Sequence, residues 1–181
     1  MYKILVTDGG YSHSLEIIRS LSKEGHKVDC IGNLYCLSSF SRYLNKVSFN
    51  QSLFRVENIN NFLSFLDREK YDYLIPIGAN SVDLVNKFRD VISKRVVINL
   101  ASSDSIKNCL YKNKLLEISK DLGIPVPKIY EEKDLKSMIK NRIKFKETVV
   151  IKPCSELSNE KVIYTSNSVS YTHLTLPTKL A

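Results

Sequence analysis

The chain has 181 residues, 43% of them hydrophobic, and a formal net charge of +8. This length suits one domain and part of a second. No apolar run approaches the roughly 20 residues that a membrane helix needs, and the apolar segment at residues 1–7 is too short for a signal peptide. We therefore expect a cytoplasmic protein with no membrane partner. The basic residues are scattered and match no nucleic-acid-binding signature, so we expect no nucleic-acid partner.

The four cysteines are irregularly spaced and form no Cys-x-x-Cys pair; they are Cys30, Cys36, Cys109 and Cys154. This spacing argues against a zinc site and against a disulfide framework. We expect reduced, mostly buried thiols.

The first 32 residues predict a strand, a helix and a second strand. Residues 3–7 are apolar and β-branched, which is typical of a strand buried on both faces of a parallel sheet. A helix is predicted from about Ser12, with Leu15, Ile18 and Leu21 on one face. The second strand is predicted at residues 27–32. The pattern indicates a βαβ unit with a right-handed crossover.

The following seventy residues repeat this alternation. Strands are predicted at 46–49, 73–77 and 96–100, and Pro76 indicates that its strand ends there or lies at an edge. Helices are predicted at 38–44 and 59–66, and a third follows the turn at 78–80 and bears Leu84, Val85, Phe88, Val91 and Ile92. Strands that alternate with helices favour an open, mostly parallel α/β sheet of the Rossmann-like class.

Ligands of such sheets bind outside the carboxyl ends of the strands. Two loops of this kind contain glycine and polar side chains. The candidate substrate-binding residues are Asp8, Gly9, Gly10 and Ser12 after the strand at 3–7, and Gly78, Asn80 and Ser81 after the strand at 73–77.

The turn at residues 8–10 has two other interpretations. A glycine turn that opens a helix can hold dinucleotide phosphates, but the full G-x-G-x-x-G fingerprint is absent, because the glycines are adjacent and position 13 is His. The turn can also need glycine only for its backbone angles. His13 either caps the helix, contacts an anionic substrate, or is exposed without a chemical role.

A polar link at residues 101–105 predicts a boundary between a domain at 1–101 and a second segment at 102–168. A helix is predicted to begin near Lys112 and to end at Gly123, where a Gly-Ile-Pro-Val-Pro turn follows. A charged helix is predicted at 131–141. Strands at 147–153, which ends in Lys152 and Pro153, and at 161–165 predict a hairpin pair.

This order of elements over residues 1–165 resembles the start of an ATP-grasp protein. The resemblance rests on two motifs. One is a lysine eleven positions before the glycine of the Gly-Ile-Pro-Val-Pro turn, and the other is an apolar strand that ends in Lys-Pro. The first domain, with the segment 41–43, is similar to the pre-ATP-grasp domain of proteins like the carbamoyl-phosphate synthase large chain. The resemblance implies an incomplete α+β ATP-grasp subdomain after it, in which Lys112 and Lys152 contact the phosphates of ATP.

The resemblance also implies an activity for the intact parent protein. Such enzymes transfer the γ-phosphoryl group of ATP to a carboxylate and form an acylphosphate, which an amine or similar nucleophile then attacks, with Mg²⁺ stabilising the charge. The partners of the parent would be a small-molecule carboxylate and a nucleophile. The resemblance also allows the parent to form a homodimer. The Mg²⁺ ligands and the adenine-binding hinge lie downstream of residue 168 in the family. We therefore expect no metal site and no catalysis in this chain alone.

The segment after Pro153 departs from the family pattern. Residues 154–160 contain no glycine, whereas the family has a glycine-rich flap there, and Glu156 adds a negative charge. Ser155 and Ser158 are the candidate flap donors. Two alternatives follow: a Rossmann-like module that binds a nucleotide or nucleotide sugar, and a degenerate ATP-grasp scaffold without catalysis.

The last residues continue no family pattern. Residues 169–178 look like one reading frame of a transposon-end adapter used in sequencing libraries. We expect the native sequence to stop near Ser168 and residues 169–181 to be foreign.

Overall fold

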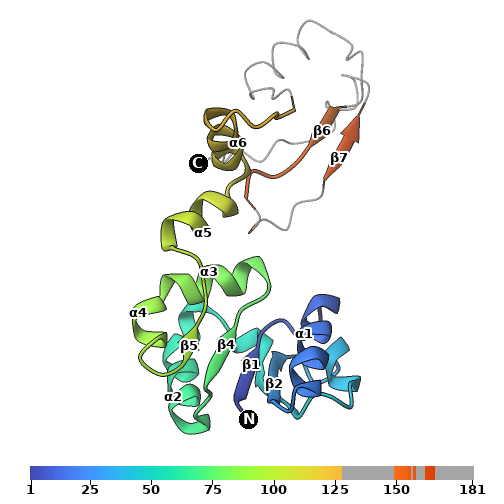
Figure 1. Cartoon of the computed structure of the whole chain (residues 1–181), viewed down its shortest axis with the longest axis vertical. Coiled ribbons are helices and arrows are strands. Elements are labelled where there is room, and N and C mark those ends of the chain that lie inside the picture. The colour runs from blue at the N-terminus through green and yellow to red at the C-terminus, as the bar shows by residue number, and fades with distance from the viewer. Residues whose placement is uncertain (128–148, 156, 158–161, 166–181) are drawn as a thin grey trace, which may run out of the picture. The chain divides into compact units, whose positions relative to one another are not determined.

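The computed structural model describes residues 1–127, 149–155, 157 and 162–165, which Figure 1 shows in colour. The chain divides into two compact units, Met1–Lys107 and Asn108–Ala181. The predicted boundary at residue 101 stays a prediction.

The first unit contains a five-stranded sheet with the strand order β3-β2-β1-β4-β5, and each neighbouring pair is parallel. The strands are β1 (Lys3–Val6), β2 (Lys27–Gly32), β3 (Lys46–Asn50), β4 (Tyr73–Ile75) and β5 (Val97–Ile98). The predicted Rossmann-like α/β sheet is therefore confirmed. Because β1 lies between β2 and β4, the winding of the sheet reverses at β1 and β4.

Helices and short 3-10 turns connect these strands. The helices are α1 (Ser12–Lys23), α2 (Ile59–Glu69), α3 (Ala79–Lys87) and α4 (Arg89–Ile92), and the 3-10 turns are η1 (Leu37–Phe40), η2 (Gln51–Leu53) and η3 (Val56–Asn58). Helix α5 (Ser103–Leu110) follows β5 and spans the boundary between the two units.

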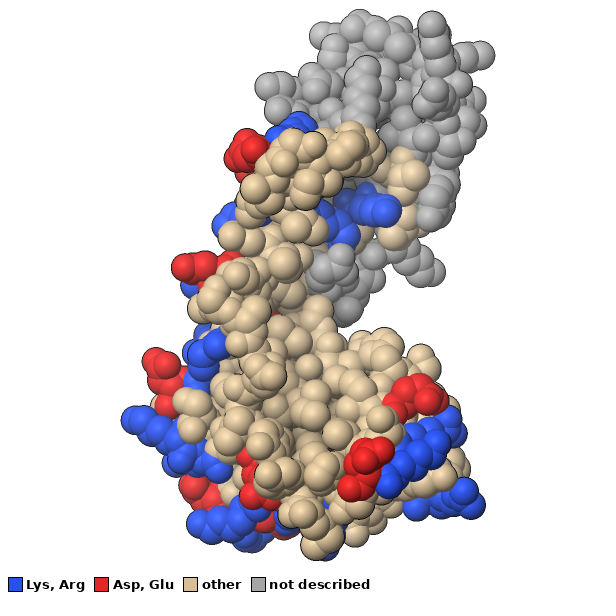
Figure 2. All heavy atoms as spheres, in the orientation of Figure 1, with Lys and Arg blue, Asp and Glu red and all other residues tan. Residues whose placement is uncertain are grey.

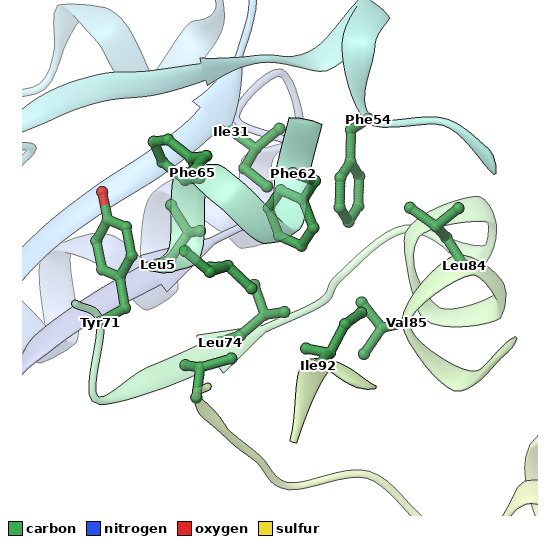
Figure 3. Close-up of a cluster of buried hydrophobic side chains, with 12 residues drawn as sticks. Leu5, Ile31, Phe54, Phe62, Phe65, Tyr71, Leu74, Leu84, Val85 and Ile92 are labelled. Carbon is green, nitrogen blue, oxygen red and sulfur yellow. The ribbon is translucent and has the colours of Figure 1, made fainter. Parts of the chain in front are cut away.

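Side chains alternate between the two faces of the sheet, and each face has its own core. On one face, Ile18 of α1 packs with Ile4, Val6, Val28 and Cys30. The opposite face carries a larger cluster, shown in Figure 3, built from β1, β2, β4, α2, α3, α4 and the segments between them. Its labelled members are Leu5, Ile31, Phe54, Phe62, Phe65, Tyr71, Leu74, Leu84, Val85 and Ile92. Burial of each large side chain of this kind stabilises the fold by roughly 1.5–3 kcal/mol.

Strand β4 ends before Pro76, which is one of the two predicted alternatives; it is not an edge strand, because it pairs with both β1 and β5. Two predicted elements differ from the structure. The predicted helix that bears Leu84 to Ile92 is broken at Phe88, where α3 ends and α4 begins. The predicted helix at 38–44 is only the 3-10 turn η1. The Ser39 hydroxyl donates to the Cys36 carbonyl at 2.7 Å there, a local bond that competes with regular helix.

In the second unit, α6 (Lys112–Asp121) follows Tyr111, and β6 (Val149–Ile151) pairs antiparallel with β7 (Ile163–Thr165). The predicted hairpin pair is therefore confirmed. Gly123 adopts a φ of 70° just after α6, which is the conformation expected of a glycine that ends a helix. The predicted helix at 131–141 and the tail at 169–181 lie outside the described residues.

The thiols divide evenly by exposure. Cys30 and Cys36 are buried, as predicted, whereas Cys109 and Cys154 are exposed, so the prediction is wrong for those two. All four thiols are free.

On the face of the first unit seen in Figure 2, basic and acidic side chains are interspersed around its rim. The absence of a nucleic-acid partner stays a prediction. No helix in the described part of the chain has the length and apolar character of a membrane span.

Candidate functional site

Two loops meet where the winding of the sheet reverses. Thr7 and Asp8 follow β1, and Ile77 and Gly78 follow β4. The Thr7 hydroxyl accepts a hydrogen bond from the Ile77 N–H at 2.9 Å, and Asp8 Oδ2 accepts one from the Gly78 N–H at 2.7 Å. This is the position at which open α/β sheets bind ligands.

Asp8 is the residue that joins these loops. Its φ is 57°, in the left-handed region that aspartate tolerates better than most residues. Its carboxylate also accepts from the Thr7 hydroxyl and, at 3.2 Å, from Gln51 Nε2. The carboxylate therefore ties together the segments that follow β1, β3 and β4. Its predicted contact with substrate stays a prediction.

Close packing explains Gly9 and Gly78 better than backbone angles do. A Cβ at Gly9 would lie 2.9 Å from the sulfurs of both Cys30 and Cys36, and a Cβ at Gly78 would lie 3.0 Å from the Asp8 carboxylate. A Cβ at Gly10 would meet nothing within 4 Å. The positive φ of this turn belongs to Asp8.

A cavity of about 260 Å³ opens between these loops. It is lined by Asp8, Gly10, Tyr11, Gly32, Asn33, Cys36, Gln51, Gly78 and Asn80. The structure thus brings four predicted site residues together on one cavity: Asp8, Gly10, Gly78 and Asn80.

Four other predicted residues of these loops are not among the lining residues. Gly9 is the residue of the turn that packs against the two buried thiols. Ser81 is buried, with 1% of its surface exposed. Ser12 and His13 are exposed at the start of α1, and the His13 ring lies 5.2 Å from that of Tyr11.

Sequence reasoning missed five of the lining residues: Tyr11, Gly32, Asn33, Cys36 and Gln51. Gly32 ends β2, Asn33 follows it, and Gln51 follows β3 directly. Ligands of open α/β sheets bind outside the carboxyl ends of the strands, and this principle, applied to β2 and β3 as well, would have found Asn33 and Gln51.

The lining residues mix polar and apolar surface, and Asp8 is the one acidic side chain among them. Asn33, Gln51 and Asn80 offer amide groups. Helices α1 and α3 both begin at this cavity, after Tyr11 and Gly78, and neither start is capped by a side-chain hydrogen bond. The N–H groups of a first helical turn have no partner within the helix. The amide side chains of the lining can donate as well as accept hydrogen bonds.

In the second unit, the start of α6 lies against the segment that follows β6. The Lys112 N–H donates to the Cys154 carbonyl at 2.8 Å, and Lys112 Nζ donates to the Pro153 carbonyl at 3.2 Å. Tyr111 also forms an isolated antiparallel bridge with Ser155. The structure therefore brings Lys112 beside the strand end that carries Lys152, whose side chain is exposed.

Of the flap candidates, Ser155 lies in this bridge and its hydroxyl accepts from the Leu157 N–H at 3.1 Å. Ser158 lies outside the described residues.

The ammonium groups of Lys112 and Lys152, on adjoining segments, suit an anion such as a polyphosphate. The described residues contain no group of three His, Cys, Asp or Glu side chains that could hold a metal ion.

No protein-family model matches the sequence, and no curated protein resembles it in sequence. Solved structures match the fold. N5-carboxyaminoimidazole ribonucleotide synthetase from Thermotoga maritima is 20% identical with a TM-score of 0.58, over 92% of this chain and 41% of that one. The L-amino acid ligase from Bacillus licheniformis is 14% identical with a TM-score of 0.61, over 94% and 39%.

A third match is the biotin carboxylase domain of the Hydrogenobacter thermophilus 2-oxoglutarate carboxylase, solved with MgADP, ADP and bicarbonate. It is 16% identical with a TM-score of 0.62, over 94% of this chain and 39% of that one. At these identities the likeness shows the fold. The chain spans about two fifths of the length of these structures.

Proposed function

We propose that the chain is the N-terminal part of an ATP-dependent carboxylate ligase of the ATP-grasp type, because its fold matches the solved structures of such enzymes. The parent would use ATP and Mg²⁺ and act on a small-molecule carboxylate and a nucleophile. Solved structures with this fold contain ADP or MgADP. The activity, the cytoplasmic location and the option of a homodimer belong to this proposal.

One observation carries the proposal. Lys112 and the strand end with Lys152 are far apart in sequence, yet Lys112 bonds directly to the carbonyl of Pro153, the residue after Lys152. Lys112 and Lys152 would bind the phosphates of ATP, where positively charged side chains favour phosphoryl transfer. Ser155, on the same segment, would offer its hydroxyl. ATP itself supplies the phosphoryl group.

The cavity of the first unit would bind the acceptor substrate. Its amide side chains and the N–H groups at the starts of α1 and α3 suit a polar ligand with an anionic group. Asp8 would act mainly by holding the loops in place, because Thr7, Gln51 and Gly78 all donate to its carboxylate.

Thermal unfolding of the full chain with ATP tests the proposal. We expect ATP, with and without Mg²⁺, to raise the melting temperature of the wild type, as any ligand of the folded state does. Lys112→Met and Lys152→Met should each reduce this rise. Lys120→Met, which changes an exposed lysine in the last turn of the same helix, is the matched control and should keep it.

The alternatives give different results in the same experiment. If ATP protection survives both lysine changes and is lost in Asp8→Ala, the first unit is a nucleotide-binding module. If ATP protects no variant, including the wild type, the lysine pair does not bind ATP in this chain. The degenerate scaffold predicts that the complete protein would not bind ATP either.

A further inference from the structure

Two buried thiols lie directly beneath the turn at Asp8–Gly10. Cys30 is in β2 and is fully buried, and Cys36 precedes η1 with 8% of its surface exposed. A Cβ at Gly9 would lie 2.9 Å from each sulfur, so both sulfurs flank the same point above the Gly9 backbone. A Cβ at Gly32 would lie 2.8 Å from the Cys36 sulfur. Because Gly9 and Gly32 have no side chains, the sulfurs can occupy the space beside their backbones.

The two sulfurs are close neighbours, because both lie 2.9 Å from the point that a Cβ at Gly9 would occupy. Burial, followed by the nearby Cys36, raises the pKa of the Cys30 thiol. Cys36 is a lining residue of the cavity, whereas Cys30 is not among the residues that line it. A small solute in the cavity therefore reaches Cys36 first.

We propose that Cys36 is a site of oxidation by peroxides and that Cys30 converts the oxidised sulfur to an intramolecular disulfide. This inference rests on the positions of the two sulfurs and is independent of the proposed ligase function. It adds a modification site to the wall of the cavity.

The chemistry needs one peroxide molecule. The Cys36 thiolate attacks one peroxide oxygen, the O–O bond breaks, and hydroxide or an alkoxide leaves, so that Cys36 becomes a sulfenic acid. The Cys30 sulfur then attacks the Cys36 sulfur, the S–O bond breaks, and water leaves with the Cys30 proton. With hydrogen peroxide, two thiols and one peroxide give one disulfide and two molecules of water.

The disulfide would change the shape of the cavity. An S–S bond is about 2.05 Å long, so the two sulfurs must move together to form it. Cys36 belongs to a loop that is tied to the turn by the Ser38 N–H, which donates to the Gly9 carbonyl at 2.9 Å. Gly32 and Asn33 of the same loop line the cavity. Oxidation would therefore alter the wall to which a ligand binds, and a dithiol reductant would restore it.

Mass spectrometry of the full chain tests the site. Cys109→Ser and Cys154→Ser together remove the two exposed thiols and leave the buried pair. Cys30 and Cys36 lie in one tryptic peptide, residues 28–42, with a potential chymotryptic site at Tyr35 between them. After hydrogen peroxide, we expect this peptide to lose about 2 Da, the mass of two hydrogens. Its two chymotryptic halves should stay linked until a reductant is added.

Single variants assign the order of events. With Cys30→Ser, a cyclic 1,3-dione probe for sulfenic acid should label Cys36 after peroxide treatment. With Cys36→Ser, oxidation of Cys30 should be lost. The proposal is overturned if the peptide keeps both free thiols at peroxide levels that oxidise exposed cysteines, or if Cys30 is oxidised equally well without Cys36. The peptide measurement on the protein with both thiols needs neither single variant to fold.

Discussion

The sheet of the first unit and the described stretch 111–127 hold candidate site residues by the same kind of contact but differ in burial. Asp8 is tied to Gly78, 70 positions along the chain, and Lys112 is tied to Pro153, 41 positions along. The first unit packs both faces of its sheet. In contrast, no residue of 111–127 is buried, and Leu115 and Leu122 are 44% and 70% exposed. Long-range hydrogen bonds therefore hold candidate residues both beside a packed core and on an exposed helix.

The largest expected effect comes from the core of the first unit. Phe62 is 1% exposed and packs against Phe49, Phe54 and Phe65. We expect Phe62→Ala to lower the free energy of unfolding by about 3–5 kcal/mol, because it leaves a cavity. Leu115→Ala, at an exposed position of α6, should cost less than about 1 kcal/mol. Urea unfolding measures both. Equal losses would contradict the difference in burial between the units.

The glycine turn provides a second test, with a control one residue away. We expect Gly9→Ala to destabilise the protein by about 1–3 kcal/mol, because the new methyl group would collide with the sulfurs of Cys30 and Cys36. Gly10→Ala has free space, and we expect no loss and a gain of up to about 1 kcal/mol. Thermal unfolding compares the two. A harmless Gly9→Ala would mean that the thiols do not pack against this turn.

A buried hydrogen-bond network gives an effect of similar size. The Tyr71 hydroxyl donates to Asp29 Oδ2 at 2.6 Å, and Asp29, in the middle of β2, is fully buried. Burial, followed by the hydrogen bond to Asp29, raises the pKa of Tyr71, so the hydroxyl stays protonated and able to donate. Tyr71→Phe should cost about 1–3 kcal/mol, since it leaves a buried carboxylate oxygen without this donor.

Tyr73→Phe is the matched control for that change. Tyr73 is only partly buried and its ring contacts Tyr2 edge-on at 5.2 Å. Loss of its hydroxyl should change the urea midpoint little. Similar shifts for the two tyrosines would show that the Asp29 contact contributes nothing specific.

The smallest effect is a dependence on pH. Glu69 accepts hydrogen bonds from Lys3 and Lys46, both at 3.1 Å, and these bonds lower its pKa from 4.5 to about 2. The folded pKa lies below the unfolded value, so the bonds stabilise the protein above pH 4.5, and this stability is lost as the pH falls toward about 2. Glu69→Gln should flatten this part of the stability profile, measured by urea unfolding at each pH. An unchanged acid slope would exclude Glu69 as its source.

Particular residues show how far sequence patterns reach. The apolar periodicity at Ile59, Phe62 and Leu66 correctly predicted α2, and the β-branched run at residues 3–6 correctly predicted a buried strand. The pattern around Pro76 could indicate the end of β4 but could not show whether the strand was central, because pairing partners are remote in sequence. In the same way, no periodicity links Gln51 to Asp8, so the third loop of the cavity was missed.

The sequence by itself determined the class of fold, the alternation of strands and helices in the first unit, and the two loops with Asp8 and Gly78, because these depend on local periodicity and on short motifs. Only the tertiary structure decided three features: the strand order that joins the ends of β1 and β4, the bond from Lys112 to Pro153, and the convergence of Cys30 and Cys36 on Gly9. Each depends on packing between distant segments, where burial and space rather than local preference select the arrangement.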